Sequence, residues 1–392
     1  MKFLLIYVPN LRFREFHTEW KKIQIGNLIK ERKEYTSDFK KYPLYSFTIE
    51  SGITPKSDRY ERSFLVKKEG DLFKIVHQND FVMNPMNLRF GAINYSKINQ
   101  IVSVSGYYDI FTIDACKYNE FWNAYLKTPR MLYTYNTIAT GSLVEKKRVY
   151  FKQLKELKMC IPSEMEKNKI NEFINLLNER IQTQSKIIEL KQSLIKDIED
   201  KILWKTTNTH AKPIREFLTE INDKSIIQNQ YPLLSSTKKG LFLQTEYFNK
   251  EAASSNNIGY KIVHKGEIII SPQNLWMGNI TFNDKFDNGL VSPSYRIYKV
   301  KEQYNTFYIS RILMSYRALS LYKNISEQGA SIVRRNLNVD AFNELCFPIP
   351  NIKKQDEVSL FLSKLHQELN YETWILMQLK SQKNYLLNNM FI

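Results

Sequence analysis

The stretch NPMNLRFGAI, residues 84–93, decides the fold because the chain contains it twice. Its second copy, SPQNLWMGNI, occupies residues 271–280, 187 positions later, and the tetrapeptide KIVH precedes both copies. Further matching pairs keep an offset between 186 and 189, such as YPLYS at 42–46 with YPLLS at 231–235. A repeat at long period dictates the architecture before any assignment of secondary structure. The sequence therefore predicts two similar globules within one chain.

Each copy begins with a globular part, at roughly 21–158 and 208–347, that alternates short β-rich runs with turn residues. IVSVSGYYDIFTI at 101–113 is one such run. One amphipathic helix is expected in each copy, over 118–138 and 304–325. We therefore expect each copy to form a mixed α/β globule, with the stretch at 84–93 as a strand end followed by a turn.

A long helix is expected after each globule, because apolar residues recur there at alternating gaps of 4 and 3. The apolar stripe of each helix is called its seam. The predicted seams consist of Ile170, Ile174, Leu177, Ile181, Ile188 and Ile195 in the first helix, and of Val358, Leu362, Leu365, Leu369, Leu376 and Leu379 in the second. Pro162 and Pro350 precede the helices, where a helix can begin but cannot extend backwards. We expect the two seams to pair; packing of each helix on its own globule is the alternative.

Together these features predict an α+β fold in which two tandem α/β globules alternate with two long helices. The helices would pair as an antiparallel coiled coil, and the chain would have internal pseudo-twofold symmetry. The predicted segments are a first globule with its N-terminal segment at 1–158, a first spacer helix at 159–207, a second globule at 208–347 and a second spacer helix at 348–392.

Composition narrows the class of protein. The chain has 392 residues, enough for two ordinary domains, and no apolar run approaches the ~20 residues of a membrane span. The apolar run from Phe3 to Val8 is too short for a signal peptide. Three scattered cysteines do not form a disulfide framework or a zinc site. We expect a reduced, cytoplasmic protein.

The positive charge is concentrated in the two globules. The net charge of +17 divides into +10 for residues 21–158 and +5 for 208–347, while the segments 1–20, 159–207 and 348–392 carry +1, 0 and +1. A merely solvated surface would spread the excess more evenly. A polyanion held by both globules fits this distribution, because neutralised phosphates release counterions and supply affinity.

The repeated loops supply the candidate DNA contacts, since base edges are read by Arg, Lys, Asn and Gln. Basic residues follow both Gly141 and Gly329, so they are expected on equivalent loops. Each loop alone is more often a solvated loop; as a matched pair we interpret them as contacts. The candidates are Asn87, Arg89, Lys146, Lys147, Arg148, Asn274, Trp276, Arg334 and Arg335.

No catalytic or metal-binding residue is predicted. Asn84-Pro85-Met86-Asn87 is similar in part to the Asn-Pro-Pro-Tyr-like loop of DNA amino-methyltransferases, but it lacks the aromatic residue that stacks a flipped base. The chain contains no Gly-x-Gly, and therefore no loop of the kind that holds S-adenosylmethionine, a dinucleotide or a nucleotide phosphate. His77 and His264 are equivalent in the repeat, lack a second ligand at metal spacing and are interpreted as structural.

The layout resembles the specificity (S) subunit of type I restriction–modification systems over essentially the whole chain. The resemblance rests on PNLRFREF at 9–16 with Trp20, on two diverged basic globules, and on two Gly-Ser/Ala…Arg…Leu…Ile-Pro segments that lead into long helices. The family's Glu-Gln at the helix start is present here only in halves, as Glu166-Lys167 and Lys354-Gln355. Its Leu-Asp further along reads Leu177-Asn178 and Leu365-His366.

The resemblance implies two target-recognition domains, each of which reads half of a bipartite site in duplex DNA. The paired helices would act as a spacer and as a platform for two methyltransferase (M) subunits, which hold S-adenosylmethionine and methylate adenine. Restriction (R) subunits, which use ATP and Mg, would join to cleave unmethylated DNA. The chain itself would be a non-catalytic recognition subunit without a cofactor.

Two other functions were weighed. A coiled-coil scaffold or RNA-binding adaptor outside a restriction system would share the basic globules and the long helices. A self-contained DNA methyltransferase is disfavoured by the missing cofactor loop. The recognised DNA sequence does not follow from residue types, because loop conformation and DNA deformation decide it.

Overall fold

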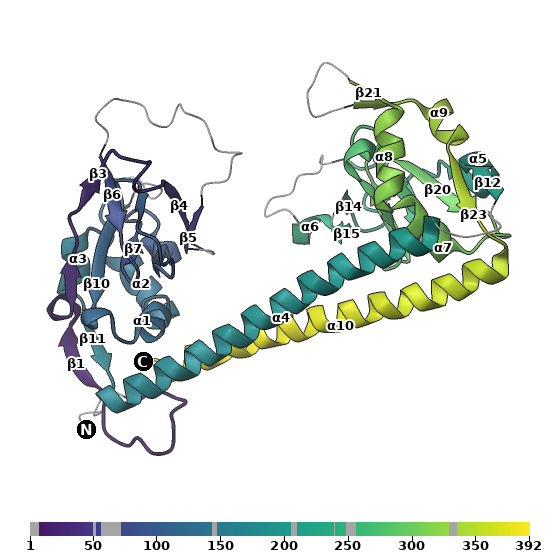
Figure 1. The fold of residues 1–392 in the computed structure, drawn as a ribbon. Coiled ribbons are helices and arrows are strands. Elements are labelled where there is room, and N and C mark those ends of the chain that lie inside the picture. Colours follow the sequence, from purple (N-terminus) through teal and green to yellow (C-terminus); the bar gives the residue numbers. More distant parts are fainter. Residues whose placement is uncertain are drawn as a thin grey trace. The chain divides into compact units, whose positions relative to one another are not determined.

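The computed structural model describes residues 8–49, 52–55, 72–142, 147–204, 210–238, 240–247, 256–328 and 335–392. The chain divides into two compact units. The first comprises Met1–Ser185 with Ile375–Ile392, and the second comprises Lys186–Trp374. Each unit therefore contains one globule and a part of each of two long helices (Figure 1).

The first unit contains most of its strands before its helices. Its strands are β1 (Lys21–Gln24), β2 (Ile29–Glu31), β3 (Tyr35–Thr36), β4 (Tyr45–Thr48), β5 (Gly52–Pro55), β6 (Phe73–Val76), β7 (Phe81–Met83), β8 (Ile93–Tyr95), β9 (Val102–Val104), β10 (Asp109–Ile113) and β11 (Lys158–Ile161). Its α-helices are α1 (Asn119–Tyr125), α2 (Pro129–Ile138), α3 (Phe151–Glu156) and the beginning of α4 (Glu164–Trp204), together with the end of α10 (Ile352–Met390).

The second unit repeats this order. Its strands are β12 (His210–Pro213), β13 (Leu218–Ile221), β14 (Leu234–Thr237), β15 (Gly240–Leu243), β16 (Lys261–His264), β17 (Ile268–Ile270), β18 (Ile280–Phe282), β19 (Asn288–Val291), β20 (Arg296–Val300), β21 (Ser326–Gln328), β22 (Arg335–Leu337) and β23 (Cys346–Ile349). Its shorter helices are α5 (Ile214–Phe217), α6 (Gln244–Tyr247), α7 (Thr306–Leu313), α8 (Tyr316–Asn324) and α9 (Val339–Glu344).

The two globules share one sheet topology. The central four-stranded sheet has the order β2-β10-β7-β8 in the first unit and β13-β20-β17-β18 in the second, and all pairs are antiparallel. Beside it, β1 pairs with β11 in the first unit and β12 pairs with β23 in the second. The predicted duplication is confirmed at the level of strand order. The pseudo-twofold relation between the copies stays a prediction.

The central strand of each sheet is buried on both faces. Phe81 and Met83 lie in the core beneath the helices, while Val82 between them lies in a second, smaller core on the other face. Ile268, Ile270 and Ile269 divide between two cores in the same way. Successive side chains of a strand point to opposite faces, so a sheet covered on both sides needs an uninterrupted apolar run. The sequences FVM and III meet this need.

In each unit, two helices follow the sheet where the sequence predicted one continuous helix, so that prediction was wrong. In the first unit the chain breaks at Thr128, whose hydroxyl accepts a hydrogen bond from the backbone N–H of Met131 at 3.4 Å. Pro129 then occupies the first turn, where its missing N–H does no harm. In the second unit, Ser315 caps the second helix through the N–H of Ala318, also at 3.4 Å. Apolar periodicity continues across both breaks, which is why it did not reveal them.

The long helices α4 and α10 run antiparallel within each unit (Figure 1). In the first unit, Lys383 Nζ donates to Asn178 Oδ1 at 2.5 Å. In the second, Lys191 Nζ lies 2.8 Å from Glu372 Oε1, and His366 Nε2 lies 2.8 Å from Glu199 Oε1. Residue numbers thus rise along α4 as they fall along α10. The predicted antiparallel pair of long helices is confirmed.

Every predicted seam residue is buried or half-buried. Ile170 and Ile174 also belong to the core of the first globule, and Val358 and Leu362 belong to the core of the second. The seam therefore continues from the helix pair into each globule. Pairing of the helices and packing on the globules, which the sequence posed as alternatives, occur together.

Buried polar residues near the start of each helix join it to its globule. Glu166 accepts from Arg12 Nε and Nη2, both at 2.7 Å, and from the indole N–H of Trp20 at 3.3 Å. Lys167 is almost fully buried and reaches Asp114 Oδ2 at 2.7 Å. At the equivalent position of the second helix, buried Gln355 accepts from the N–H of Asn305 at 2.9 Å. The contacts of Glu166 fix the first turn of α4 to the N-terminal segment, while those of Lys167 and Gln355 fix a long helix to the loop that precedes α1 or α7.

Candidate nucleic-acid interface

The repeated stretch that opened the sequence folds into the same loop in both units. After β7 and after β17 the chain turns, forms one turn of 3₁₀ helix at Leu88–Phe90 or Leu275–Met277, and enters the next strand. Gly91 and Gly278 end these turns with φ of 86° and 88°, a left-handed conformation that favours glycine. The interpretation of this stretch as a strand end and turn is confirmed.

A backbone contact fixes each loop beside a predicted arginine. The N–H of Val149 donates to the carbonyl of Pro85 at 3.0 Å, which holds the neighbouring Arg148 near the first loop. The N–H of Arg335 donates to the carbonyl of Gln273 at 3.2 Å. The structure therefore brings together, in each unit, the repeated loop and the basic segment that the sequence placed about 60 residues later. We call these two assemblies the first and second loop sites.

The first loop site presents cations stacked on exposed aromatic rings. The guanidinium of Arg89 lies 5.0 Å from the ring centre of Phe90 and donates from Nη1 to Asn136 Oδ1 at 3.3 Å. Phe90 is 60% exposed, and Asn87 is exposed beside it. The guanidinium of Arg148 lies 5.3 Å from the ring centre of Tyr107. Burial raises the pKa of Tyr107 against the opposing effect of Arg148, so its hydroxyl keeps its proton at neutral pH.

The second loop site carries a different set of side chains on the same backbone. Trp276 occupies the position of Arg89, and the guanidinium of Arg335 stacks 4.6 Å from the centre of its indole. The indole N–H of Trp276 and the Nε–H of Arg335 are buried and have no acceptor within the part of the chain that the structure describes. Asn274 precedes the 3₁₀ turn and is half-buried. The two sites share a scaffold and differ in the groups they offer.

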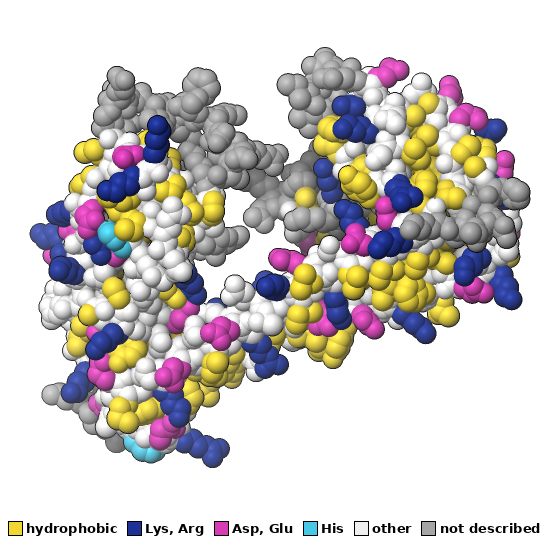
Figure 2. All heavy atoms as spheres, in the orientation of Figure 1, with side chains coloured by type: hydrophobic (Ala, Val, Ile, Leu, Met, Phe, Trp, Pro, Cys, Tyr) yellow, Lys and Arg dark blue, Asp and Glu magenta, His cyan; other side chains and the backbone are white. Residues whose placement is uncertain are grey.

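The remaining candidates are placed unequally. Lys147 is half-buried at the edge of the first loop site. Lys146 and Arg334 lie outside the described residues. On the face that Figure 2 shows, Lys and Arg side chains lie over both globules and alternate with acidic ones.

The described residues of the loop sites include no cluster of metal-ligating side chains. Within the described ranges, no three His, Cys, Asp or Glu side chains gather as a metal site would require. His77 contacts Glu34 Oε2 at 2.8 Å, and His264 contacts Asn288 Oδ1 at 2.7 Å, so both repeat histidines have local polar partners. None of the helices in the described ranges is both long and apolar enough to span a bilayer.

Comparison with known proteins gives a match of fold alone. No protein-family model and no curated protein matches the sequence. Among solved structures, the S subunit of a type I restriction–modification system from M. genitalium matches with a TM-score of 0.54 and 14% identity, covering 98% of this chain and 99% of that one. A second match, from work on complex assembly and conformational transition of the type I R-M system, has a TM-score of 0.55 and 11% identity, and covers 95% of this chain and 97% of that one. The chain has the S-subunit fold.

Within this S-subunit fold, the long helices expose large apolar side chains that the seam pattern did not predict. On α10 of the second unit, Tyr371 and Trp374 are 62% and 53% exposed, and their rings stack at 5.9 Å. Leu190 and Leu194 on α4 are similarly exposed. Figure 2 shows hydrophobic side chains on the surface of the long helices. The signal available in the sequence was apolar residues that fall outside the 4-and-3 register.

Sequence reasoning also missed the aromatic partners of the two arginines in the first loop site. Phe90 lies inside the repeated stretch, and Tyr107 lies in the turn between β9 and β10. Both are exposed large hydrophobic residues. An arginine next to an aromatic residue in a repeated loop was the available signal for Phe90. Tyr107 meets Arg148 only through the tertiary fold.

Proposed function

We propose that this chain is the DNA-recognition subunit of a type I restriction–modification complex and acts in the cytoplasm without catalytic activity of its own. Each loop site would contact one half of a bipartite site in duplex DNA. The observation that carries the proposal is one loop scaffold built twice with different side chains, in a chain that has the S-subunit fold over nearly its full length. Two loop sites with different side chains on one chain fit a DNA site whose two halves differ in sequence.

The chemistry of the loop sites fits DNA. Arginine donates two hydrogen bonds to guanine in the major groove, and asparagine does the same for adenine. The Arg89 and Asn87 pair offers both in the first site, and Arg335 with Asn274 offers both in the second. Stacking on Phe90 or Trp276 holds each guanidinium plane in one orientation, which lowers the entropic cost of a specific contact.

The partners follow from the same proposal. Two methyltransferase (M) subunits would dock on the long helices and supply S-adenosylmethionine, and restriction (R) subunits would supply ATP- and Mg-dependent cleavage of unmethylated DNA. The exposed Tyr371 and Trp374 support a protein contact on the helices, because aromatic residues are enriched where interfaces carry most of their binding energy. The chain would recognise the DNA site and set the distance between its two halves, and the partner subunits would catalyse the reactions.

A binding assay on the full chain tests the proposal first. Electrophoretic shifts with duplex DNA and with duplex RNA of the same sequence, over a salt series from 50 to 300 mM, should show tighter binding to DNA. The logarithm of the binding constant should fall linearly with the logarithm of salt concentration, by about 0.9 per phosphate contacted. Equal or tighter binding to RNA would favour an adaptor outside restriction systems. Incorporation of labelled methyl groups by the isolated chain would contradict the non-catalytic role.

A further inference from the structure

Each unit contains a cavity at the same place in the repeat. The cavity of the first unit, about 250 Å³, lies between α1, the first half of α4 and the end of α10. The cavity of the second unit, about 340 Å³, lies between α7, α8, the end of α4 and the beginning of α10. Asn178 and His366 are 188 positions apart and line one cavity each, and so do Thr128 and Ser315, 187 apart. The repeat therefore built the cavity twice.

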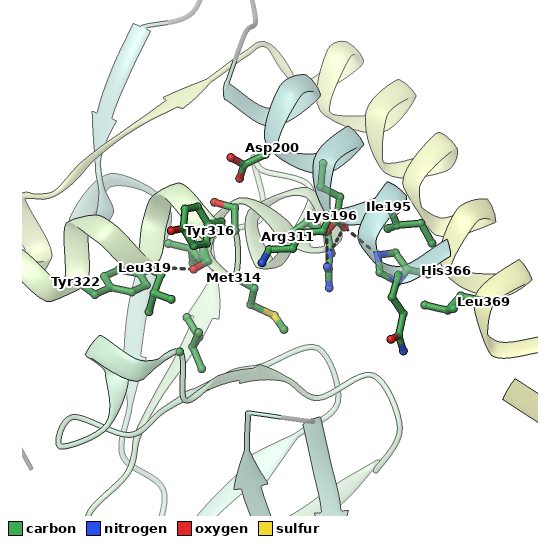
Figure 3. A pocket seen from close by; sticks show the side chains of 16 residues that line it. Ile195, Lys196, Asp200, Arg311, Met314, Tyr316, Leu319, Tyr322, His366 and Leu369 are labelled. Carbon is green, nitrogen blue, oxygen red and sulfur yellow. Dashed lines mark hydrogen bonds and ion pairs between the residues drawn. The ribbon is translucent and has the colours of Figure 1, made fainter. Parts of the chain in front are cut away.

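In the cavity of the second unit, a buried carboxylate pairs with the basic side chains that line it. Arg311 donates from Nε and Nη2 to the two carboxylate oxygens of Glu199, at 2.6 and 2.8 Å, and His366 contacts the same carboxylate at 2.8 Å. Figure 3 shows Arg311 and His366 converging on this point from different elements. Glu199 is buried, and His366 and Arg311 hold its pKa below the ordinary value even though burial opposes them. Lys196 and Asp200 also line this cavity and carry opposite charges, so its lining has no excess of positive charge.

The cavity of the first unit lacks that carboxylate. Leu387 stands 188 positions after Glu199 and occupies the equivalent place. The cavity is instead lined by Lys127 and Lys383, whose ammonium groups donate to the neutral amide oxygens of Asn94 and Asn178. The carboxylate of Glu120 also lines the cavity, where it accepts hydrogen bonds from Lys97, from the Tyr95 hydroxyl and from the Asn178 amide. Its charge opposes the effect of burial on the pKa of Lys127 and of Lys383. Across the described ranges, neither Lys127 nor Lys383 has a carboxylate within salt-bridge distance.

Two half-buried ammonium groups without a carboxylate in direct contact are costly, because desolvation disfavours the charged form. Burial, and then the charge of Lys383, lowers the pKa of Lys127 to about 8. Burial also lowers the pKa of Lys383. In addition, the Oδ1 atom of Asn123, which lines the cavity, is buried and lacks a partner among the described residues. Rotating this amide by half a turn would point its NH₂ group to the same spot, since O and N are nearly indistinguishable in shape.

We propose that the cavity of the first unit binds a dianionic oxyanion of the phosphate class, held by Lys127 and Lys383 with the Asn123 amide as a further donor. With Glu120 paired to Lys97, the charges of Lys127 and Lys383 remain in excess, and an excess of two positive charges matches a ligand with two negative charges. Charge-assisted hydrogen bonds from ammonium groups to such an oxyanion are about twice as strong as neutral ones. The ligand would tie α1 of the globule to both long helices. The inference does not depend on DNA recognition.

The test uses the full chain, with inorganic phosphate and sulfate as probes. Isothermal titration at constant ionic strength should give one site per chain. Lys383→Met and Lys127→Met should each weaken binding roughly tenfold or more, because the loss of one hydrogen bond to a charged group changes a binding constant by at least about that factor. Lys380→Met, an exposed lysine on the same helix, is the matched control and should leave binding unchanged. Lys383→Arg, which keeps the charge, should retain most of the affinity.

A pH series and a comparison of ligands test the proposal further. Affinity for sulfate, whose charge is constant over this range, should fall as pH rises through about 8, where Lys127 loses its proton. Ribose 5-phosphate binding as tightly as inorganic phosphate would identify a phosphomonoester as the ligand; weaker binding would identify the free ion. Ligand concentrations stay below about 10 mM, because phosphate and sulfate at higher levels stabilise proteins without a site. Absence of binding at these concentrations, or equal binding by the double variant Lys127→Met/Lys383→Met, would overturn the proposal.

Discussion

At the scale of single residues, the two loop sites present two different sets of side chains on one backbone. Gly91 and Gly278 fix the same turn, so the side chains at the following and preceding positions are free to differ. Arg89 in one copy and Trp276 in the other stand on equivalent atoms of the scaffold. Under the proposed function, a few exchangeable side chains on this backbone would determine which half-sequence each site recognises.

Arg89→Ala should weaken specific DNA binding by about 1–3 kcal/mol and relax the preference at one half of the site only, because one bidentate base contact is lost. Arg335→Ala should do the same to the other half. Selection of bound duplexes from a random pool, followed by sequencing, measures both effects. Arg130→Ala, an exposed arginine of the first globule away from the loop, serves as control. Loss of preference in both halves from either variant would contradict separate readers.

Glu199 sets a pH dependence of stability in the second unit. Its pKa is lowered by His366 and Arg311, which outweigh the opposing effect of burial. A carboxylate with a lowered pKa stabilises the folded state above its ordinary pKa of 4.5 and loses that contribution as pH falls through the lower, folded-state value. Glu199→Gln should therefore unfold more easily by about 1–3 kcal/mol at pH 7, since Arg311 loses its charged partner.

The measurement is chemical denaturation of wild type and Glu199→Gln at several pH values between 3 and 7. The difference between the two proteins should be largest near neutrality and should shrink below the ordinary carboxyl range. Glu368→Gln, a more exposed carboxylate on α10, is a suitable comparison and should change little. A difference that stays constant over this pH range would show that the Glu199 charge is not the cause.

At the scale of elements, the long helices divide their surface between three uses. The seam faces the partner helix, the ends of the seam enter the globule cores, and Tyr371 and Trp374 remain exposed on α10. Leu365 packs against the core of the second globule, so a charged residue there would damage the globule as well as any partner contact. The exposed residues give a cleaner test of docking.

Tyr371→Ser with Trp374→Ser should weaken assembly with the methyltransferase subunit by at least ~2 kcal/mol, since exposed aromatic residues are the typical energetic centres of interfaces. The stability of the isolated chain should change little. Leu362→Ala, which is fully buried, should instead lower the free energy of unfolding by about 2–5 kcal/mol. Co-purification and denaturation of each variant separate the two effects. Unchanged assembly by the double serine variant would place docking elsewhere.

Apolar periodicity in the sequence predicted the long helices, but it did not predict the break between two shorter helices or a contact between distant segments. The seam was predictable because a 4-and-3 spacing has one geometric meaning over 40 residues. The division of α1 from α2 was missed, because a hydroxyl cap at Thr128 or Ser315 interrupts the hydrogen bonds without interrupting the apolar pattern. The cation–aromatic pair of Arg148 and Tyr107 was also missed, since it joins segments 41 residues apart that only the fold brings together.

At the scale of the whole molecule, the repeat itself was the strongest predictor. It predicted two similar globules, whose sheet orders are the same in the structure, and a long helix after each. It also placed two cavities at equivalent positions, but their chemistry diverged where Leu387 replaced the equivalent of Glu199. Duplication preserved the scaffold, and substitution within it separated the roles of the copies.

The central claim is that each unit recognises one half of the DNA site. The most direct test replaces the first globule with a copy of the second. Residues 21–158 are replaced by a second copy of 208–347, cooperative unfolding confirms that the chimera folds, and bound duplexes are selected from a random pool for both proteins. We predict that wild type selects two different half-sequences, whereas the chimera selects two copies of the half read by the second unit. A chimera that selects the original site, or one that loses both halves, would contradict modular recognition by the two units.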